Sequence, residues 1–209
     1  MRKLLTEFIG TFFLVLTIGL SALGGVPFTP LVIGAALMAM VYMGGHVSGA
    51  HYNPAVSLAV VVAGKMRGRE LAPYWVSQIL GASAAGLAVK AIMAKTMAPA
   101  PSEAHSALAV WLVEILFTFA LALVVLNVAV SEKTKGNSYY GLAIGLTVAV
   151  GAAAGGAVSG GVFNPAVGTG LIAVQAIAGA GGWGNLPLYW LAPAAGAVLA
   201  AFVFKLQEE

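Results

Sequence analysis

Two copies of a twelve-residue segment limit the folds open to this chain more than any other part of its sequence. Residues 45–56 and 156–167 are identical at eight of twelve positions, and both contain Asn-Pro-Ala. Asn is a favoured N-cap, and Pro is favoured at the first helical position because its missing N–H would be unbonded there anyway. The segments therefore predict two helix starts, at Asn53-Pro54-Ala55 and at Asn164-Pro165-Ala166.

Six longer apolar runs accompany these two helix starts. They cover about residues 4–23, 31–46, 71–94, 108–130, 139–155 and 187–205. Each is close to the roughly 20 residues that cross a bilayer as a helix. The runs after Asn53 (to about residue 63) and Asn164 (to about residue 174) are too short to cross, which predicts re-entrant half-helices.

The composition agrees with a membrane protein. Hydrophobic residues make up 60% of the chain and charged residues 8%, whereas a soluble domain has about 25% charged residues. Six spans leave room only for short connections, which excludes a separate soluble catalytic domain and a nucleic-acid module. The chain has no Cys, so it has no disulfide framework and no Cys-based metal site.

The duplication extends beyond the Asn-Pro-Ala segments, because Glu7 and Glu114 lie at matching places in the first and fourth spans. The repeats cover about residues 1–95 and 107–205, and each holds three spans. An odd number of spans inverts the second repeat relative to the first. We therefore predict one all-α channel domain over residues 1–209, with six transmembrane helices and two half-helices around a central site near the midplane.

The basic residues predict the orientation. With the N-terminus in the cytoplasm, eight of the ten lie on the cytoplasmic side and only Lys90 and Lys95 lie outside. This agrees with the positive-inside rule. An even number of spans then places both termini in the cytoplasm. The eight are Arg2, Lys3, Lys65, Arg67, Arg69, Lys133, Lys135 and Lys205.

Inversion makes the two half-helix starts approach each other from opposite faces. Each helix N-terminus carries about half a positive charge from its macrodipole. Two such ends in a low-dielectric midplane disfavour cations and protons. The amides of Asn53 and Asn164 would donate to a passing oxygen, and a water held by both donors cannot relay a proton through that point.

Four other polar residues are candidates for a role near the half-helices. Glu7 and Glu114 are the only carboxylates inside the spans, where a charge costs roughly 2.5–3.5 kcal/mol. Their symmetric placement favours hydrogen bonds to the backbone of the re-entrant loops over proton coupling. His46 and His51 precede the first half-helix and are interpreted as loop-anchoring or pore-lining, with a pH-sensing role as the alternative. No metal site is expected, because the chain has neither Asp nor Cys to add ligands.

Aromatic pairs begin the third and sixth spans. Tyr74-Trp75 and Tyr189-Trp190 occupy matching positions. Tyr and Trp are enriched where membrane meets water, so we expect these side chains to anchor the helices at the membrane interface.

Taken together, the six spans, the two Asn-Pro-Ala boxes with a Ser-Gly before each, and the paired glutamates resemble the aquaporin (major intrinsic protein) family over essentially the whole chain. The resemblance implies a passive pore in each subunit and a homotetramer. It implies no enzyme activity and no cofactor. The expected partners are water, small neutral solutes and the lipid bilayer, with no nucleic acid.

One position departs from that family. Most members carry Arg directly after the second Asn-Pro-Ala, where this chain has Val167. By distance from the boxes, the family's four selectivity-filter positions fall on Ile33, Ala152, Gly161 and Val167. Arg would add a charge and five donors, so this filter is apolar, and we expect it to be wide. The predicted function is a channel for water and small neutral solutes such as glycerol, urea or ammonia that excludes ions and protons.

Two other functions are compatible with parts of this pattern. An ion- or proton-coupled secondary transporter also uses inverted repeats and broken helices, but it needs more titratable groups than this chain offers. A poorly conducting structural member would need surface for partners, and the short loops leave little. The short basic N-terminus favours the plasma membrane, with the vacuolar membrane as the alternative. The segment from Thr96 to Ser106, with Pro99 and Pro101, is expected to shape the outer mouth of the pore.

Overall fold

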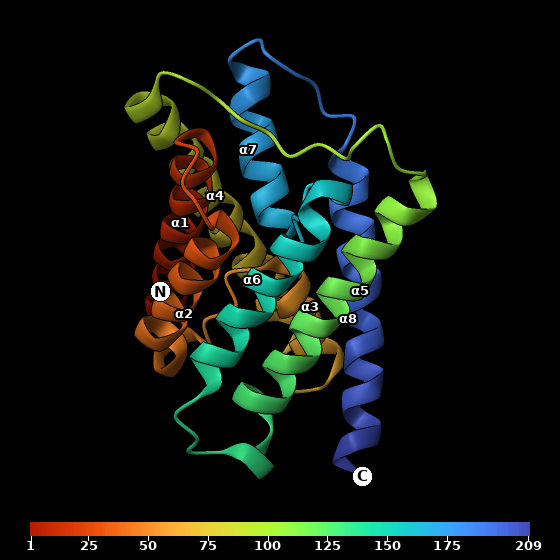
Figure 1. Ribbon diagram of the computed structural model, residues 1–209. Coiled ribbons are helices and arrows are strands. Elements are labelled where there is room, and N and C mark those ends of the chain that lie inside the picture. Colours follow the sequence, from red (N-terminus) through yellow and green to blue (C-terminus); the bar gives the residue numbers. More distant parts are fainter.

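All regular secondary structure of the chain is helical in a computed structural model that describes residues 1–209. Six helices are long and apolar enough to cross a membrane. They are α1 (Arg2–Leu23), α2 (Thr29–Ser48), α4 (Leu71–Met93), α5 (Ala107–Val125), α6 (Tyr140–Ser159) and α8 (Leu186–Glu208). Two shorter helices, α3 (Pro54–Val62) and α7 (Pro165–Ile177), lie among the long ones (Figure 1). The predicted six spans and two half-helices are confirmed.

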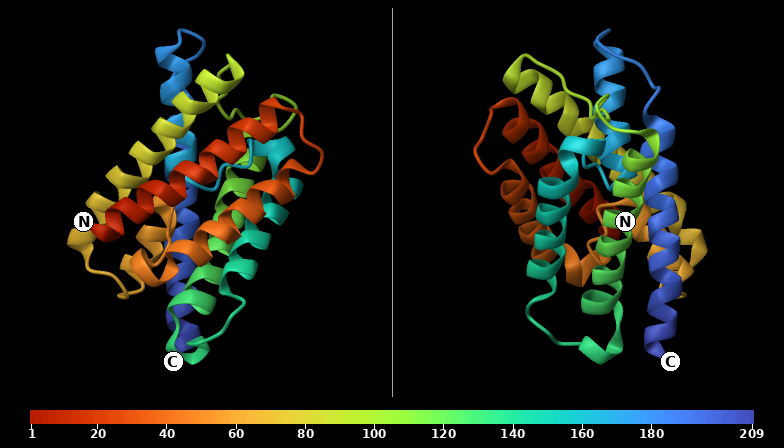
Figure 2. Two further views of the ribbon diagram at one scale, coloured as in Figure 1. Left: turned by 90° about the vertical axis from the view of Figure 1, so that its left-hand side faces the viewer. Right: turned by 45° about the vertical axis from the view of Figure 1, so that its right-hand side comes forward.

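The helices form a first half, α1 to α4, and a second half, α5 to α8. Within the halves α1 packs along α4 and α5 packs along α8, while α2 and α6 join the halves. Figure 2 shows the two groups of long helices and the short helices between them. The α2–α6 contact is a backbone contact, because a Cβ added to Gly34 would collide with the carbonyl of Gly145, and the reverse also holds. Small residues let membrane helices approach in this way.

The same close approach occurs once inside each half. A Cβ added to Gly81 of α4 would collide with the carbonyl of Phe8 in α1. A Cβ added to Gly196 of α8 would likewise collide with the carbonyl of Ile115 in α5. These glycines hold the first and last helices of each half close enough to enclose a re-entrant segment.

We call the face with the start of α1 and the end of α8 the termini face. It also carries the α5–α6 connection, which includes a π-helical turn (Leu126–Val130) and a 3₁₀ turn (Glu132–Thr134) that the sequence did not predict. Asn127 in the π-helical turn donates to Gln207 Oε1 (2.9 Å), and Ser131 donates to Glu208 Oε1 (2.7 Å). This connection is therefore fastened to the end of α8. The opposite face carries the α1–α2, α4–α5 and α7–α8 connections (Figure 1).

Candidate functional site

The two Asn-Pro-Ala segments begin the half-helices as the sequence predicts. Asn53 and Asn164 have extended backbones and are the N-caps of α3 and α7. Their side-chain oxygens accept from the N–H groups of Ala55 (2.9 Å) and Ala166 (3.0 Å). Each cap satisfies one of the N–H groups that a helix start leaves unbonded. Both half-helices thus begin sharply, with their N-terminal ends toward the centre of the molecule.

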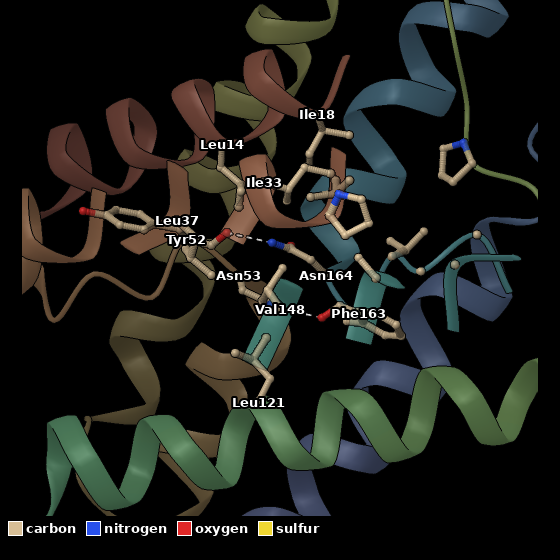
Figure 3. A pocket seen from close by; sticks show the side chains of 18 of the residues that line it. Leu14, Ile18, Ile33, Leu37, Tyr52, Asn53, Leu121, Val148, Phe163 and Asn164 are labelled. Carbon is tan, nitrogen blue, oxygen red and sulfur yellow. Dashed lines mark hydrogen bonds between the residues drawn. The ribbon is translucent and has the colours of Figure 1, made fainter. Parts of the chain in front are cut away.

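The two helix starts are tied to each other by a pair of crossed hydrogen bonds. Asn53 Nδ2 donates to the carbonyl of Phe163 (2.9 Å), and Asn164 Nδ2 donates to the carbonyl of Tyr52 (2.9 Å), as Figure 3 shows. An Asn amide has two N–H groups, and each crossed bond uses one of them. Because both residues line the central cavity, one N–H of each side chain remains available to a molecule inside it.

Glu7 holds the loop before Asn53. One carboxylate oxygen accepts from the Ser48 hydroxyl (2.6 Å) and from the N–H of His51 (3.0 Å). The other accepts from the N–H of Tyr52 (2.7 Å) and from Gln78 Nε2 (2.8 Å). Four donors fill the acceptor sites of this fully buried side chain. These hydrogen bonds offset the free-energy cost of burying a carboxylate inside the membrane.

Glu114 holds the loop before Asn164 in the matching way. It accepts from the Ser159 hydroxyl (2.7 Å) and from the N–H groups of Val162 (2.9 Å) and Phe163 (2.7 Å). It is also fully buried. The geometry agrees with the structural role expected for the two glutamates, because each carboxylate is occupied by the loop that it faces.

These glutamates stabilise a backbone that non-glycine residues rarely adopt. Ala50, Tyr52 and Phe163 all have left-handed backbones, with φ of 50°, 48° and 50°. Such residues cost about 1–3 kcal/mol each and persist only where the surroundings hold them. At the place that matches Ala50 the second loop has Gly161 (φ 62°), which adopts this conformation without strain.

The hydrogen bonds around Ser57 determine which tautomer neutral His51 adopts. Gln78 must turn its amide nitrogen to Glu7, so its second N–H donates to Ser57 Oγ (3.0 Å). Ser57 in turn donates to the carbonyl of Asn53 (3.1 Å). The remaining contact, His51 Nδ1 to Ser57 Oγ (3.0 Å), then requires a proton on Nδ1. Neutral His51 therefore presents Nε2 as a hydrogen-bond acceptor.

The structure places the two histidines in different surroundings. His51 is buried and lines both the central cavity and a hollow at the termini face. His46 is exposed on the last turn of α2 and its side chain makes no hydrogen bond within the chain. The interpretation of His46 as loop-anchoring is wrong, because the left-handed turn that begins at Gly49 carries the chain away from it.

The aromatic pairs are not interfacial anchors, contrary to the prediction. Tyr74 and Tyr189 are buried and donate to the carbonyls of Ser48 and Ser159, both at 2.7 Å. These carbonyls belong to the last residues of α2 and α6. The re-entrant segments lie beside the starts of α4 and α8, so the phenols meet protein there and find partners inside it.

The tryptophans contact the half-helices. Trp75 Nε1 donates to the carbonyl of Pro54 (3.0 Å), and Trp190 Nε1 donates to Thr169 Oγ1 (2.9 Å). The two indole rings meet edge to face, with centroids 5.2 Å apart. They join the two half-helices from the side, whereas the sequence alone predicted anchors at the membrane interface.

A central cavity of about 220 Å³ runs past the two helix starts. Its walls are mostly apolar and come from four of the long helices (α1, α2, α5 and α6), both half-helices and both re-entrant loops. Leu14, Ile33 and Leu37 lie on one side of the asparagines and Leu121 and Val148 on the other (Figure 3).

Polar contacts in the cavity come chiefly from the loops. The carbonyl oxygens of Ala50, His51, Gly161 and Val162 accept no hydrogen bond within the chain, and these residues line the cavity. Together with the free asparagine N–H groups, they offer a passing polar molecule acceptors and donors along an otherwise apolar wall.

All four residues expected at the filter line this one cavity: Ile33, Ala152, Gly161 and Val167. Two of them are close neighbours, because a Cβ added to Gly161 would lie 3.6 Å from the Cα of Ala152. Val167 is buried, with 5% of its surface exposed. None of the four carries a charge or a side-chain hydrogen-bonding group.

Such a cavity, between two half-helix starts inside a bundle of membrane-spanning helices, defines a class of protein, the passive transmembrane channels. The comparisons with known proteins agree. The family model described as Major intrinsic protein matches residues 1–204, and the chain belongs to the major intrinsic protein family.

Curated relatives align along the whole chain. Aquaporin NIP1-4 of Oryza sativa subsp. japonica is 36% identical and covers 99% of this chain and 77% of its own length. Glycerol uptake facilitator protein-like 6 of Lactiplantibacillus plantarum is also 36% identical, with 99% and 98% covered. Aquaporin AqpM of Methanothermobacter marburgensis is 33% identical, with 98% and 96% covered.

Among solved structures, the aquaglyceroporin from Plasmodium falciparum matches with a TM-score of 0.86. Its sequence is 23% identical, and the match covers 99% of this chain and 96% of that chain. This likeness agrees with the fold described above.

Some residues of the site were not found from the sequence. Gln78 and Ser57 complete the surroundings of Glu7 and His51, and Met97 lines the cavity beside Pro99, whose segment was expected to shape the outer mouth. Only Gln78 carried a usable signal, as an amide side chain inside an apolar span.

Proposed function

We propose that this channel conducts water together with at least one larger neutral solute, for which glycerol, urea and ammonia are the candidates. The observation that carries the proposal is the uncharged wall formed by Ile33, Ala152, Gly161 and Val167 in one cavity. Ala152 has only a methyl group and Gly161 has no side chain, which favours a wide passage at this point. A narrow apolar ring would remove hydrogen bonds from water at about 1–3 kcal/mol each, so width is what allows conduction.

Exclusion of ions and protons is assigned to the paired helix starts. Asn53 and Asn164 each keep one N–H for the cavity, beside the positive ends of α3 and α7. A cation at this point would meet two dipole ends and two donors. With no Arg at position 167, this midplane barrier is the main electrostatic barrier in the passage.

Substitution Val167→Arg tests the proposal. Arg should narrow the cavity and lower glycerol and urea permeability about tenfold or more, while water permeability falls less than about threefold. Val167→Leu, which keeps the position apolar, is the matched control. Permeability would be measured by stopped-flow light scattering on proteoliposomes. Equal loss of water and solute flux in Val167→Arg would contradict the assignment of Val167 to the filter.

We also infer that residues 1–209 form one channel domain of two inverted repeats, about 1–95 and 107–205. The matched bonds of Glu7 and Glu114 support this inference. A homotetramer is proposed on the family resemblance, and native mass spectrometry would test it by the mass of the assembly.

The plasma membrane, with both termini in the cytoplasm, is the proposed location. The basic residues near the termini face support the orientation through the positive-inside rule. Because the chain has no Cys, single Cys residues can be labelled without background. An impermeant maleimide added outside cells should label Gly182→Cys and leave Gly136→Cys unlabelled. The reverse pattern would invert the proposed orientation.

A further inference from the structure

The connection between α4 and α5, residues 94–106, contains no helix and crosses the face opposite the termini (Figure 1). It is fastened to the second half by the N–H of Ser102, which donates to the carbonyl of Val158 (3.0 Å). Its backbone also lies against the second re-entrant loop, because a Cβ added to Gly160 would be 3.2 Å from the carbonyl oxygen of Ala100. The connection is therefore seated directly beside the proposed filter.

Two side chains of this connection reach the central cavity. Met97 and Pro99 line it together with the four proposed filter residues. Met97 is half-buried and packs against the apolar cluster that contains Val162 and Val167. The connection therefore forms part of the wall of the passage at its mouth.

The proposed filter has small side chains at Ala152 and Gly161, so the neighbouring wall formed by the α4–α5 connection affects the width of the passage. Ala152 adds only a methyl group to the wall, and Gly161 adds no side chain; a Cβ on Gly161 would meet the Cα of Gly156 in α6 at 3.1 Å. This part of the wall is therefore backbone and one methyl group, and neither can reach into the passage. A Met side chain has three rotatable bonds and a polarisable sulfur, and it fills irregular gaps well. Pro99 and Pro101 fix backbone φ on the chain that follows Met97, which limits how far the connection can move away.

We propose that Met97 is a specificity-determining residue of this channel and sets the largest neutral solute that can pass. Its side chain narrows the mouth of the cavity on the side of the second re-entrant loop, and Pro99 and Ala100 hold it there. The inference rests on the proposed conduction of neutral solutes and adds the residue that limits their size. The solutes are uncharged polyols and amides, because the wall offers carbonyl acceptors, amide donors, the Nε2 of neutral His51 and apolar surface, but no charged residue.

Polyols of increasing length test the proposal in proteoliposomes of the full chain: glycerol, erythritol and xylitol. In Met97→Ala, erythritol or xylitol permeability should rise about tenfold, with water within about twofold of the unmodified chain. In Met97→Phe, glycerol permeability should fall by a similar factor. Met43→Ala is the matched control, since Met43 is exposed on α2, and its size limit should be unchanged.

The outcomes separate this inference from the proposed function. If Met97→Ala and Met97→Phe leave the size limit unchanged while Val167→Arg lowers it, the inference about Met97 is overturned and the proposed function stands. If the unmodified chain passes only water and Met97→Ala admits glycerol, Met97 is the sieve and the wide filter is wrong. If no variant passes a solute larger than water, both are overturned.

Discussion

The loop before Asn53 and the loop before Asn164 share a backbone shape but differ in the side chains that surround them. In both, a buried Glu accepts from a Ser hydroxyl and from two backbone N–H groups. Only Glu7 has a fourth donor, Gln78. At the place that matches Gln78, the second half has Pro193, which has no donor to offer.

The same difference continues around the passage. His51 and Ser57 of the first half match Val162 and Gly168 of the second. The loop geometry therefore does not need the counterparts of Gln78, His51 and Ser57, since the second half achieves it without them. The additional polar groups of the first half orient His51, whose ring borders the passage. The second half supports its loop with fewer polar side chains, and the first half adds the polar ring of His51 to the cavity wall.

Removing the charge of either glutamate should have the largest effect. Glu7→Gln and Glu114→Gln each place an amide where only acceptors fit, and a hydrogen bond to a charged group contributes about 1.5–3 kcal/mol. Both should lower the Tm of the purified protein, and Glu7→Gln should lower it more because four donors, against three at Glu114, bond the carboxylate that loses its charge. Differential scanning fluorimetry in detergent would measure the shift.

Glu103→Gln, in the exposed α4–α5 connection, is the control for these variants and should leave Tm unchanged. A larger loss for Glu114→Gln than for Glu7→Gln would contradict the comparison of the two loops.

Charge at the helix starts should have the next largest effect. Asp in place of Asn53 or Asn164 keeps the oxygen that caps the helix but loses the N–H that crosses to the other half. A carboxylate beside each dipole end should admit cations, with a leak that rises about tenfold in either variant. A potassium-flux assay in liposomes would detect it. An unchanged leak in both variants would count against the midplane barrier.

Loss of the extra donor in the first half should cost less. Gln78→Leu removes one donor from Glu7 and one from Ser57, at about 1–3 kcal/mol for the groups left unpaired. The protein should still fold, because Glu114 holds its loop without such a donor. Gln175→Leu, whose side chain bonds only the nearby Ala180 carbonyl, is the control. A Tm for Gln78→Leu equal to that of the control would contradict the claim that Gln78 stabilises the first loop.

Making the first half like the second should have the smallest effect. His51→Val replaces the ring with the residue found at the matching position, and the N–H that bonds Glu7 belongs to the backbone. Folding should be retained, and water permeability should stay within about threefold of the original, since only one acceptor leaves the wall. Stopped-flow measurement would check this, and loss of folded protein would show that His51 supports the loop.

Much of this arrangement could be predicted because it follows from the internal repeat of the sequence. Two Asn-Pro-Ala segments in repeats of three spans predict opposed half-helices, and paired Glu7 and Glu114 predict anchored loops. The half-helix bounds differ only slightly, with α7 reaching Ile177 where residue 174 was expected. Apolar run length and helix-start chemistry are local properties, so the sequence contains them.

The remainder depends on side-chain surroundings that the repeat does not preserve. Gln78 could not be found by matching the halves, since Pro193 replaces it. A Trp at a helix start, such as Trp75, can face either lipid or a neighbouring helix. Here the re-entrant segment lies next to it, and Trp75 bonds the first residue of α3. Met97 lies on a connection without periodicity, and only the packing of that connection brings it to the cavity.

Stopped-flow light scattering on liposomes that contain the purified protein, challenged with a glycerol gradient, tests the central claim most directly. An uncharged wall of Ile33, Ala152, Gly161 and Val167 predicts fast shrinkage as water leaves, followed by accelerated re-swelling as glycerol enters. Fast shrinkage without accelerated re-swelling would contradict the wide filter. No acceleration of either phase would contradict the channel itself.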